Sequence, residues 1–351
     1  MEMGTSDWRA QPSTPVELDG AALRREARNV VRNFLQVAGG EEVALLRWRA
    51  RPLAQAFAIA VADVGGRPHP IGIEDLEHTA EARVAHLLDD RLRGCTASLL
   101  LAEHGLPPAI SMAVLAGAER HGLRHLHLTR IEPRLFLESY RADPSRIERI
   151  NERIVSLLEG AGQLEVTSPA GTMLHVRLDP YFPLLHASGR ATPGRPENLP
   201  SGWVVFHPAG VEGTFVADRG AIGAVRPDPA LVRRHPLRVR FAQGRVVSAE
   251  SESPELTRIV ERYLRMHPHA ARVGLVALPT NYTIEAETGV EIQDALLPGV
   301  NVALGYSNPT HSKAPFRCSV QLRLFGRELD VTAGGVPLVR RGRFVPELLA
   351  V

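Results

Sequence analysis

The first part of the chain alternates between short apolar runs and segments with apolar residues every three or four positions. Residues 42–48, 95–102 and 123–129 are rich in apolar residues and of strand length. Residues 52–63 and 107–121 have the helical spacing, and each begins with a proline, which the first helical turn accepts without losing a hydrogen bond. This alternation predicts a mostly parallel sheet with helices on its faces.

The clearest helical pattern follows this region. Asp143 is a good N-cap, Pro144 suits the first turn, and Gly160 and Gly162 mark the end. Five aliphatic residues recur on one face between them, namely Ile147, Ile150, Ile154, Leu157 and Leu158. We expect this helix to connect two domains.

From residue 163 the pattern changes to short strands separated by Gly or Pro. Gln243 and Gly244 suit a hairpin turn, because glycine tolerates a positive φ. One amphipathic helix, residues 254–266, interrupts the strands. The expected strands are residues 164–167, 172–177, 203–207, 214–218, 237–241 and 245–249. This texture predicts an antiparallel-rich α+β domain.

The predicted fold is therefore α/β plus α+β. We expect a disordered leader over residues 1–18, an α/β domain over residues 19–138 and a connector helix over residues 139–162. Residues 163–351 would then form the α+β domain.

Composition and charge narrow the possible functions. The 351 residues, 44% of them hydrophobic, are enough for roughly two ordinary domains. Lys and Arg number 41 against 39 Asp and Glu, which indicates neither a nucleic-acid partner nor an anionic membrane. No apolar run approaches the ~18 residues of a membrane span, and the N-terminal residues lack the apolar core of a signal peptide. Cys95 and Cys318, far apart, suit a reducing compartment, so we expect a cytoplasmic protein.

Common nucleotide-binding and catalytic motifs are absent. No Gly-x-Gly-x-x-Gly follows a predicted strand, and the chain has neither a Gly-Lys-Ser/Thr phosphate loop nor a Gly-x-Ser-x-Gly elbow. We expect no nucleotide cofactor and no serine hydrolase chemistry.

Several short motifs recur in a fixed order along most of the chain. Residues 166–172 read Val-Thr-Ser-Pro-Ala-Gly-Thr, residues 198–202 read Asn-Leu-Pro-Ser-Gly, and residues 302–305 read Val-Ala-Leu-Gly. With residues 20–43 and 211–214, they resemble the thermophilic metallo-aminopeptidases (aminopeptidase T/S) and the related 2,5-dihydroxypyridine dioxygenases, which use non-haem iron. The resemblance implies the fold of those proteins and a site in the C-terminal half.

The resemblance also implies where metal ligands would stand. It places two glutamates at Trp203 and Leu275, a histidine at Asn301, and a closing His-x-Asp pair at Cys318 and Val320. A two-metal hydrolase needs carboxylate and imidazole ligands to bind its metals and activate water. The iron ligands of the dioxygenases come from the same histidine segments. The sequence therefore predicts a cleft without a metal.

The replaced positions define the expected ligand-binding site. Trp203 either plugs the cleft or offers an aromatic surface, and Asn301 either binds a peptide group or is a satisfied buried amide. Tyr306 matches a position near the former site. The expected site comprises Trp203, Asn281, Asn301, Tyr306 and Cys318.

Other groupings have a functional and a structural reading. His125 and His127 lie two apart on a strand, so both could ligate a metal or form hydrogen bonds in the core. His267 and His269 lie at a helix end, where histidine is favoured for structural reasons. An acidic loop forms either a cation site or a solvated face, and its members are Glu285, Glu287, Glu291 and Asp294.

An aminopeptidase frame admits a peptide end, so the leading hypothesis is a non-catalytic peptide-binding protein. In this respect the chain resembles the crocagin-type accessory proteins of ribosomal-peptide natural-product pathways, which bind a precursor peptide. One alternative is a hydrolase or isomerase with relocated, metal-independent chemistry on Cys318, His311 or Glu285. Another is a regulatory partner of an active homologue, and a homodimer is possible because the aminopeptidases are dimers.

Overall fold

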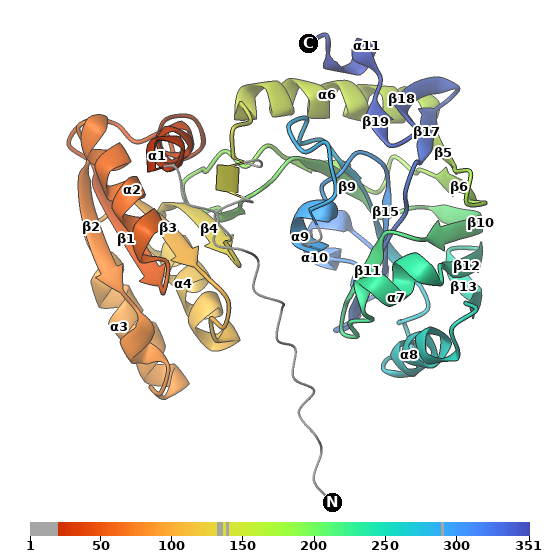
Figure 1. Cartoon of the computed structure of the whole chain (residues 1–351), viewed down its shortest axis with the longest axis horizontal. Helices are drawn as coiled ribbons and strands as arrows, with labels where there is room; N and C mark the ends of the chain where they lie inside the picture. The colour runs from red at the N-terminus through yellow and green to blue at the C-terminus, as the bar shows by residue number, and fades with distance from the viewer. Residues whose placement is uncertain (1–19, 132–135, 138–139, 289–290) are drawn as a thin grey trace, which may run out of the picture.

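The described part of the chain contains three β-sheets, one parallel and two antiparallel, with helices around them. A computed structural model describes residues 20–131, 136–137, 140–288 and 291–351, so the leader expected over residues 1–18 lies outside the described residues. The parallel sheet lies on the left of Figure 1 and the antiparallel sheets lie on the right. The expected fold class, α/β plus α+β, is confirmed.

The five-stranded parallel sheet has the order β2-β1-β3-β4-β8. Its central strand β3 is buried at every position, as expected for a parallel strand covered on both faces. The strands are β1 (Glu42–Trp48), β2 (Arg67–Gly72), β3 (Ala97–Ala102), β4 (Arg124–Thr129) and β8 (Glu197–Asn198).

Helices cover both faces of this sheet. Leu99 and Leu101 of β3 pack with residues of α1 (Gly20–Asn29) and α2 (Arg51–Asp63), whereas Leu100 packs with α3 (Glu81–Leu92) and α4 (Pro108–Arg120). Two short turns of helix, η1 (Val30–Phe34) and η2 (Glu74–Leu76), complete this part.

Helix α6 (Pro144–Ala161) begins and ends as its sequence predicts. The Asp143 carboxylate accepts a hydrogen bond from the backbone N–H of Ser145 at 2.9 Å, and Gly162 adopts a left-handed φ of 65°. Its buried face carries Ile147, Ile150, Ile154 and Leu158. In Figure 1 the helix lies along the top of the antiparallel part.

The eight-stranded sheet has the order β13-β12-β10-β6-β5-β17-β18-β19. At the turn between β12 and β13, Gln243 and Gly244 both have positive φ, 49° and 68°, which matches a two-residue hairpin. The strands are β5 (Gln163–Thr167), β6 (Met173–Arg177), β10 (Gly210–Ala217), β12 (Leu237–Ala242), β13 (Arg245–Glu250), β17 (Asp330–Ala333), β18 (Val336–Arg340) and β19 (Arg343–Phe344).

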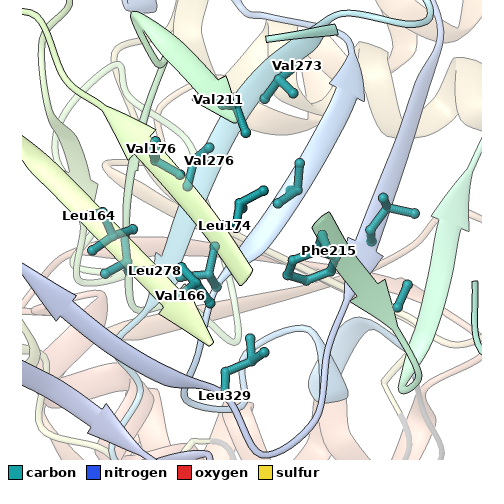
Figure 2. Close-up of a cluster of buried hydrophobic side chains, with 14 of the residues drawn as sticks. Leu164, Val166, Leu174, Val176, Val211, Phe215, Val273, Val276, Leu278 and Leu329 are labelled. Atoms are coloured by element: carbon teal, nitrogen blue, oxygen red, sulfur yellow. The ribbon is translucent and has the colours of Figure 1, made fainter. Parts of the chain in front are cut away.

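The six-stranded sheet has the order β11-β16-β15-β14-β9-β7. One of its faces packs on the eight-stranded sheet, and Figure 2 shows Val276 and Leu278 from it beside Leu164, Val166 and Leu174. Its strands are β7 (Leu185–Ala187), β9 (Trp203–Phe206), β11 (Gly220–Gly223), β14 (Val273–Pro279), β15 (Asn301–Gly305) and β16 (Gln321–Phe325). The two antiparallel sheets therefore share one core.

The remaining helices are short connections around these sheets. Among the described residues, no helix combines the length and the apolar content needed to cross a bilayer. These helices are α7 (Pro229–Arg234), α8 (Pro254–Arg265), α9 (Glu291–Asp294), α10 (Pro309–Ser312) and α11 (Pro346–Leu349).

The chain returns to the parallel sheet after entering the antiparallel part. Strand β8 pairs with β4, with Glu197 opposite Leu126, and β9 begins only a few residues later at Trp203. The connecting segment, residues 199–202, is held by hydrogen bonds at both ends. The Leu199 carbonyl accepts from the Tyr140 hydroxyl at 3.0 Å, and the Gly202 carbonyl accepts from the Thr280 N–H at 2.8 Å.

The core between the antiparallel sheets should dominate stability. Phe215 is fully buried there, so Phe215→Ala is expected to lower the free energy of unfolding by about 3–5 kcal/mol through lost burial and a residual cavity. The matched control is Met173, which is 73% exposed on a strand of the same sheet. Met173→Ala is expected to change the free energy of unfolding by less than about 0.5 kcal/mol. Urea unfolding followed by circular dichroism measures both, and equal losses would contradict this account of the core.

Candidate functional site

The outer face of the six-stranded sheet carries a pocket of about 270 Å³. Side chains alternate along each strand, so Val204, Val276, Val302 and Leu322 enter the core between the sheets while their neighbours face outward. The outward side chains form the pocket floor, which includes Trp203, Leu275, Asn301, Ala303, Gln321 and Arg323.

The pocket walls come from two segments beside the sheet. Ala295 and Leu296 follow α9, while Tyr306 and Asn308 precede α10. The Asn301 side-chain amide donates to the Ala295 carbonyl at 2.7 Å, which ties one wall to the floor. In Figure 1, α9 and α10 lie on the side of the antiparallel part nearer the parallel sheet.

Three of the five residues expected from sequence line this pocket: Trp203, Asn301 and Tyr306. Trp203 is half-buried, and space remains beside its indole, so it forms part of the pocket floor and does not fill the pocket. Tyr306 is 43% exposed and stands at the rim. The floor is thus partly aromatic and partly amide.

Asn281 lies outside the pocket lining and holds the segment that leads into Trp203. It is buried, and its amide donates to the Ser201 carbonyl at 3.0 Å. Gly202, with φ of +116°, passes so close that a Cβ there would lie 2.8 Å from the Asn281 backbone nitrogen. Only glycine allows this approach.

Cys318 also lies outside the pocket lining, and residues a few positions later in the chain line the pocket in its place. The buried Cys318 Sγ contacts the Val320 carbonyl at 3.4 Å, and neither residue lines the pocket. Gln321 and Arg323, which have the same two-residue spacing, do line it from β16. Sequence motifs missed them, although the alternation of polar residues with Leu322 carried the signal.

The pocket does not fit a transition metal in the described part of the chain. Its lining there includes no His, Cys, Asp or Glu side chain. No group of three or more such side chains able to hold a metal ion occurs anywhere among the described residues. Iron and zinc take imidazole, thiolate or carboxylate ligands, whereas Arg323 places a positive charge on the floor.

His125 and His127 form a buried hydrogen-bonded pair within the parallel sheet. The Ser98 hydroxyl contacts His125 Nδ1 at 2.8 Å, His125 Nε2 lies 3.2 Å from His127 Nδ1, and the Ser111 hydroxyl contacts His127 Nε2 at 2.8 Å. Burial lowers the pKa of His125 well below its usual value and that of His127 to about 4. Both rings are therefore neutral at pH 7. Their contacts match the second alternative stated for this pair, histidines that form hydrogen bonds in the core.

The pair at the end of α8 also has internal contacts. The His269 backbone N–H donates to His267 Nδ1 at 3.1 Å, and the His269 ring lies 5.1 Å from the ring of Phe316. His267 and His269 therefore make contacts within their own loop and with Phe316, as expected for histidines with a structural role.

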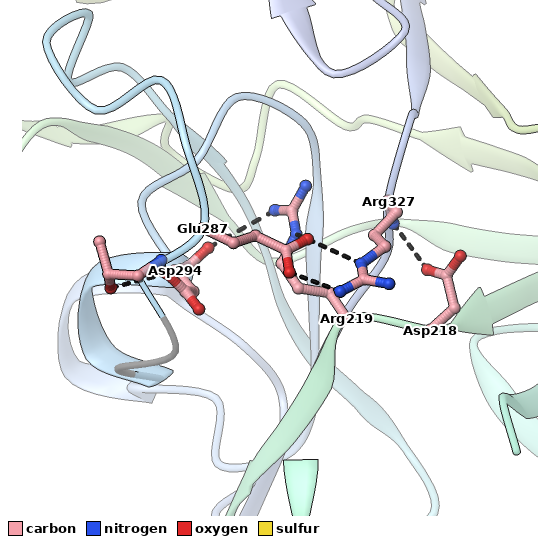
Figure 3. A network of polar contacts seen from close by, with 6 residues as sticks. Asp218, Arg219, Glu287, Asp294 and Arg327 are labelled. Carbon is pink, nitrogen blue, oxygen red and sulfur yellow. Dashed lines mark hydrogen bonds and ion pairs between the residues drawn. The ribbon is translucent and has the colours of Figure 1, made fainter. Parts of the chain in front are cut away.

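The acidic loop is held by arginines. Figure 3 shows Glu287 between Arg327, whose Nε donates to it at 2.7 Å, and Arg219, whose Nε lies 3.6 Å away. The Asp294 carboxylate accepts from the Thr288 N–H at 2.7 Å. Burial opposes ionisation of Glu287, but hydrogen bonding and charge from Arg327, with Arg219, outweigh it and lower its pKa. Glu285 is exposed, and the side chain of Glu291 lies outside the description.

This ionic network positions one wall of the pocket. Arg327 follows β16, Arg219 precedes β11, and the Arg219 guanidinium also reaches the Asp294 carbonyl at 3.5 Å. Ala295 and Leu296, which line the pocket, come directly after Asp294. The acidic loop is therefore a structural clamp on the wall.

Family membership is decided by a match over residues 29–264. The model of the NicX family, described as 2,5-dihydroxypyridine 5,6-dioxygenase, matches that range. The chain belongs to the NicX family. Its match to the NicX model ends before Leu275, Asn301, Gln321 and Arg323, which form much of the pocket floor.

Two solved structures resemble this NicX-family chain over nearly its whole length. The 2,5-dihydroxypyridine dioxygenase from Pseudomonas putida KT2440 has a TM-score of 0.65 at 16% identity, covering 95% of this chain and 100% of that one. Wild-type AmpT from Thermus thermophilus has a TM-score of 0.63 at 18% identity, covering 93% of this chain and 99% of that one. At these identities the likeness shows the shared fold, which confirms the resemblance expected from the motifs. No curated protein sequence matches the chain.

The buried histidines predict a loss of stability in mild acid. Unfolded histidines titrate near pH 6.5, whereas these rings stay neutral when folded, so the unfolded state binds more protons as the pH falls from about 6.5 toward 4. The free energy of unfolding should fall by up to about 1.4 kcal/mol per pH unit for each ring. Urea unfolding at pH 7 and pH 5 tests this. His127→Gln should reduce the pH dependence and the exposed His186→Gln should not, so equal slopes in all three proteins would refute the assignment.

The arginine clamp predicts a loosened pocket wall when Arg327 is removed. Arg327→Ala leaves Glu287 with one distant arginine, so the free energy of unfolding should fall by about 1–3 kcal/mol and amide exchange should quicken in residues 284–288 and 293–297. Arg341, which pairs with Glu328 where both side chains are more than half exposed, is the control. Arg341→Ala should change stability by less than about 1 kcal/mol. Unchanged exchange in the loop of Arg327→Ala would show that the network does not hold the wall.

Proposed function

We propose that this NicX-family chain is a non-catalytic peptide-binding protein, and that the metal site of its relatives is lost. The observation that carries the proposal is the composition of the pocket. At the positions where the resemblance implies metal ligands stand an indole, an aliphatic side chain and an amide, from Trp203, Leu275 and Asn301. These groups suit an organic ligand and do not suit a metal ion.

The size and lining of the pocket support a peptide end as the occupant. Its volume of about 270 Å³ lies just below the roughly 300–1,000 Å³ common for ligand pockets. It therefore suits a single terminal residue with part of its neighbour. Trp203 and Tyr306 offer aromatic contact, and the side-chain amides of Gln321 and Asn308 can exchange hydrogen bonds with peptide groups.

The ligand we propose is a precursor peptide of a ribosomal natural-product pathway. The basis is the resemblance to the crocagin-type accessory proteins, and a cytoplasmic location accompanies it as an expectation. A homodimer is a further expectation, taken from the aminopeptidases.

Relocated catalysis has less support among the described residues. The buried Cys318 thiol contacts a backbone carbonyl, whereas His311 and Glu285 are exposed. No interaction joins any two of these three residues in the described part of the chain. A nucleophile requires a base within hydrogen-bond reach, so this trio gives no basis for a second proposal.

Removal of the Trp203 indole is expected to weaken peptide binding while folding survives. Truncation of a large aromatic contact commonly costs about 2 kcal/mol or more, so affinity in Trp203→Ala should fall at least about 10-fold. Titration calorimetry with short peptides encoded beside the gene measures it. Tyr181→Ala, which removes an aromatic side chain that is 63% exposed and outside the pocket lining, is the control. Equal affinity in wild type and Trp203→Ala would move the site elsewhere.

Metal analysis tests the non-catalytic part of the proposal. Purified protein is expected to hold no stoichiometric iron, zinc or cobalt by mass spectrometry, because the described pocket offers no carboxylate, imidazole or thiolate. Peptide affinity should be the same with and without a chelator. Stoichiometric metal, or turnover of a peptide that the chelator abolishes, would sink the proposal.

A further inference from the structure

Arg323 brings a positive charge to the floor of the pocket. On β16 it lies opposite Ala303 of the neighbouring strand β15 and opposite Ile222 of β11, so its side chain shares their face of the sheet. Because Ala303 is small, nothing long from that position competes for the same space. The guanidinium thus belongs to the pocket and not to the protein core.

Arg323 has no carboxylate partner among the described residues. Its one polar contact there runs from Nη2 to the Gln321 Oε1 at 3.5 Å, at the limit of a hydrogen bond. A guanidinium carries five N–H donors, so most of those of Arg323 have no hydrogen-bond acceptor among the described residues. Arg219 and Arg327, by contrast, both pair with Glu287.

The surroundings of this charge are partly buried and poor in negative charge. Burial lowers the pKa of Arg323, although an arginine stays charged at any physiological pH. The described lining of the pocket includes no acidic side chain. A partly desolvated cation without a counter-ion is unfavourable in the empty protein, and an anion from outside would relieve the cost.

We propose that Arg323 binds a carboxylate of the ligand, so that the peptide end admitted by the pocket is a C-terminus. The peptide part of this inference rests on the proposed function. A guanidinium pairs with a carboxylate through two parallel hydrogen bonds, whereas it repels the ammonium group of a peptide N-terminus. The Trp203 and Tyr306 rings favour an aromatic or apolar side chain next to that carboxylate.

The same carboxylate chemistry occurs in a peptide C-terminus and in a small aromatic acid, and three probes separate the two sources. They are N-acetyl-Gly-Phe with a free carboxylate, the same compound as its C-terminal amide, and 3-phenylpropionate. Titration calorimetry of the full chain should show the free acid binding about 10- to 100-fold more tightly than the amide, since the amide lacks the charge-assisted hydrogen bonds.

Variants at position 323 assign the effect to this side chain. Arg323→Gln should abolish the preference for the acid over the amide, and Arg323→Lys should restore only part of it, because lysine keeps the charge without the planar fork. The matched control is Arg240→Gln, since Arg240 is exposed on β12 of the other antiparallel sheet. That variant should keep the wild-type preference. Without ligand, the Tm of Arg323→Gln should equal or exceed that of wild type, because a charge without a carboxylate partner is removed.

The outcomes separate this inference from the proposed function. Equal binding of acid and amide, both weakened by Trp203→Ala, would overturn the carboxylate site and leave peptide binding intact. Binding of 3-phenylpropionate that depends on Arg323, with neither peptide bound, would support the carboxylate site and overturn peptide binding. If no probe binds at about 1 mM, or if Arg323→Gln unfolds at a much lower Tm, the carboxylate site is wrong and Arg323 serves the fold.

Discussion

The two-residue alternation of side chains along β14, β15 and β16 is the constraint on which both the core and the pocket depend. Leu322 and Leu324 point into the core between the antiparallel sheets, so Gln321 and Arg323 must point the other way. A register slip of one residue would bury the charge and expose two leucines. The free energy of the shared core therefore fixes which side chains line the pocket.

Local signals in the sequence predicted elements up to residue 266, such as β1, α2 and α8, because each depends on neighbours in the chain, whereas strands β14 to β19 were not predicted. The cap at Asp143, the helical spacing of α6 and the turn at Gln243 and Gly244 all appear where the pattern places them. The two-residue strand β8 was missed, because its pairing with β4 spans about 70 positions and carries no pattern of its own. The clamp around Glu287 also joins residues far apart in the chain, with 40 positions between Glu287 and Arg327, and side-chain type alone does not predict such pairs.

The candidate site was predictable only as far as the family motifs fix positions. Trp203 and Asn301 start strands within well-matched segments, and both line the pocket. Near Cys318 the motif alone did not identify the lining residues, because Cys318 precedes β16 whereas Gln321 and Arg323 lie on that strand and line the pocket. The alternation of polar and apolar residues along β16 identifies Gln321 and Arg323 as the residues that face the pocket.

The connection between β8 and β9 is only a few residues long, yet hydrogen bonds hold it along its length. Its carbonyls at Leu199, Ser201 and Gly202 accept hydrogen bonds from Tyr140, Asn281 and Thr280. The strand before it belongs to the parallel sheet, and the residue after it is Trp203. The indole is thereby positioned by both halves of the molecule before any ligand arrives, so a ligand that packs on it loses little affinity to the ordering of this part of the floor.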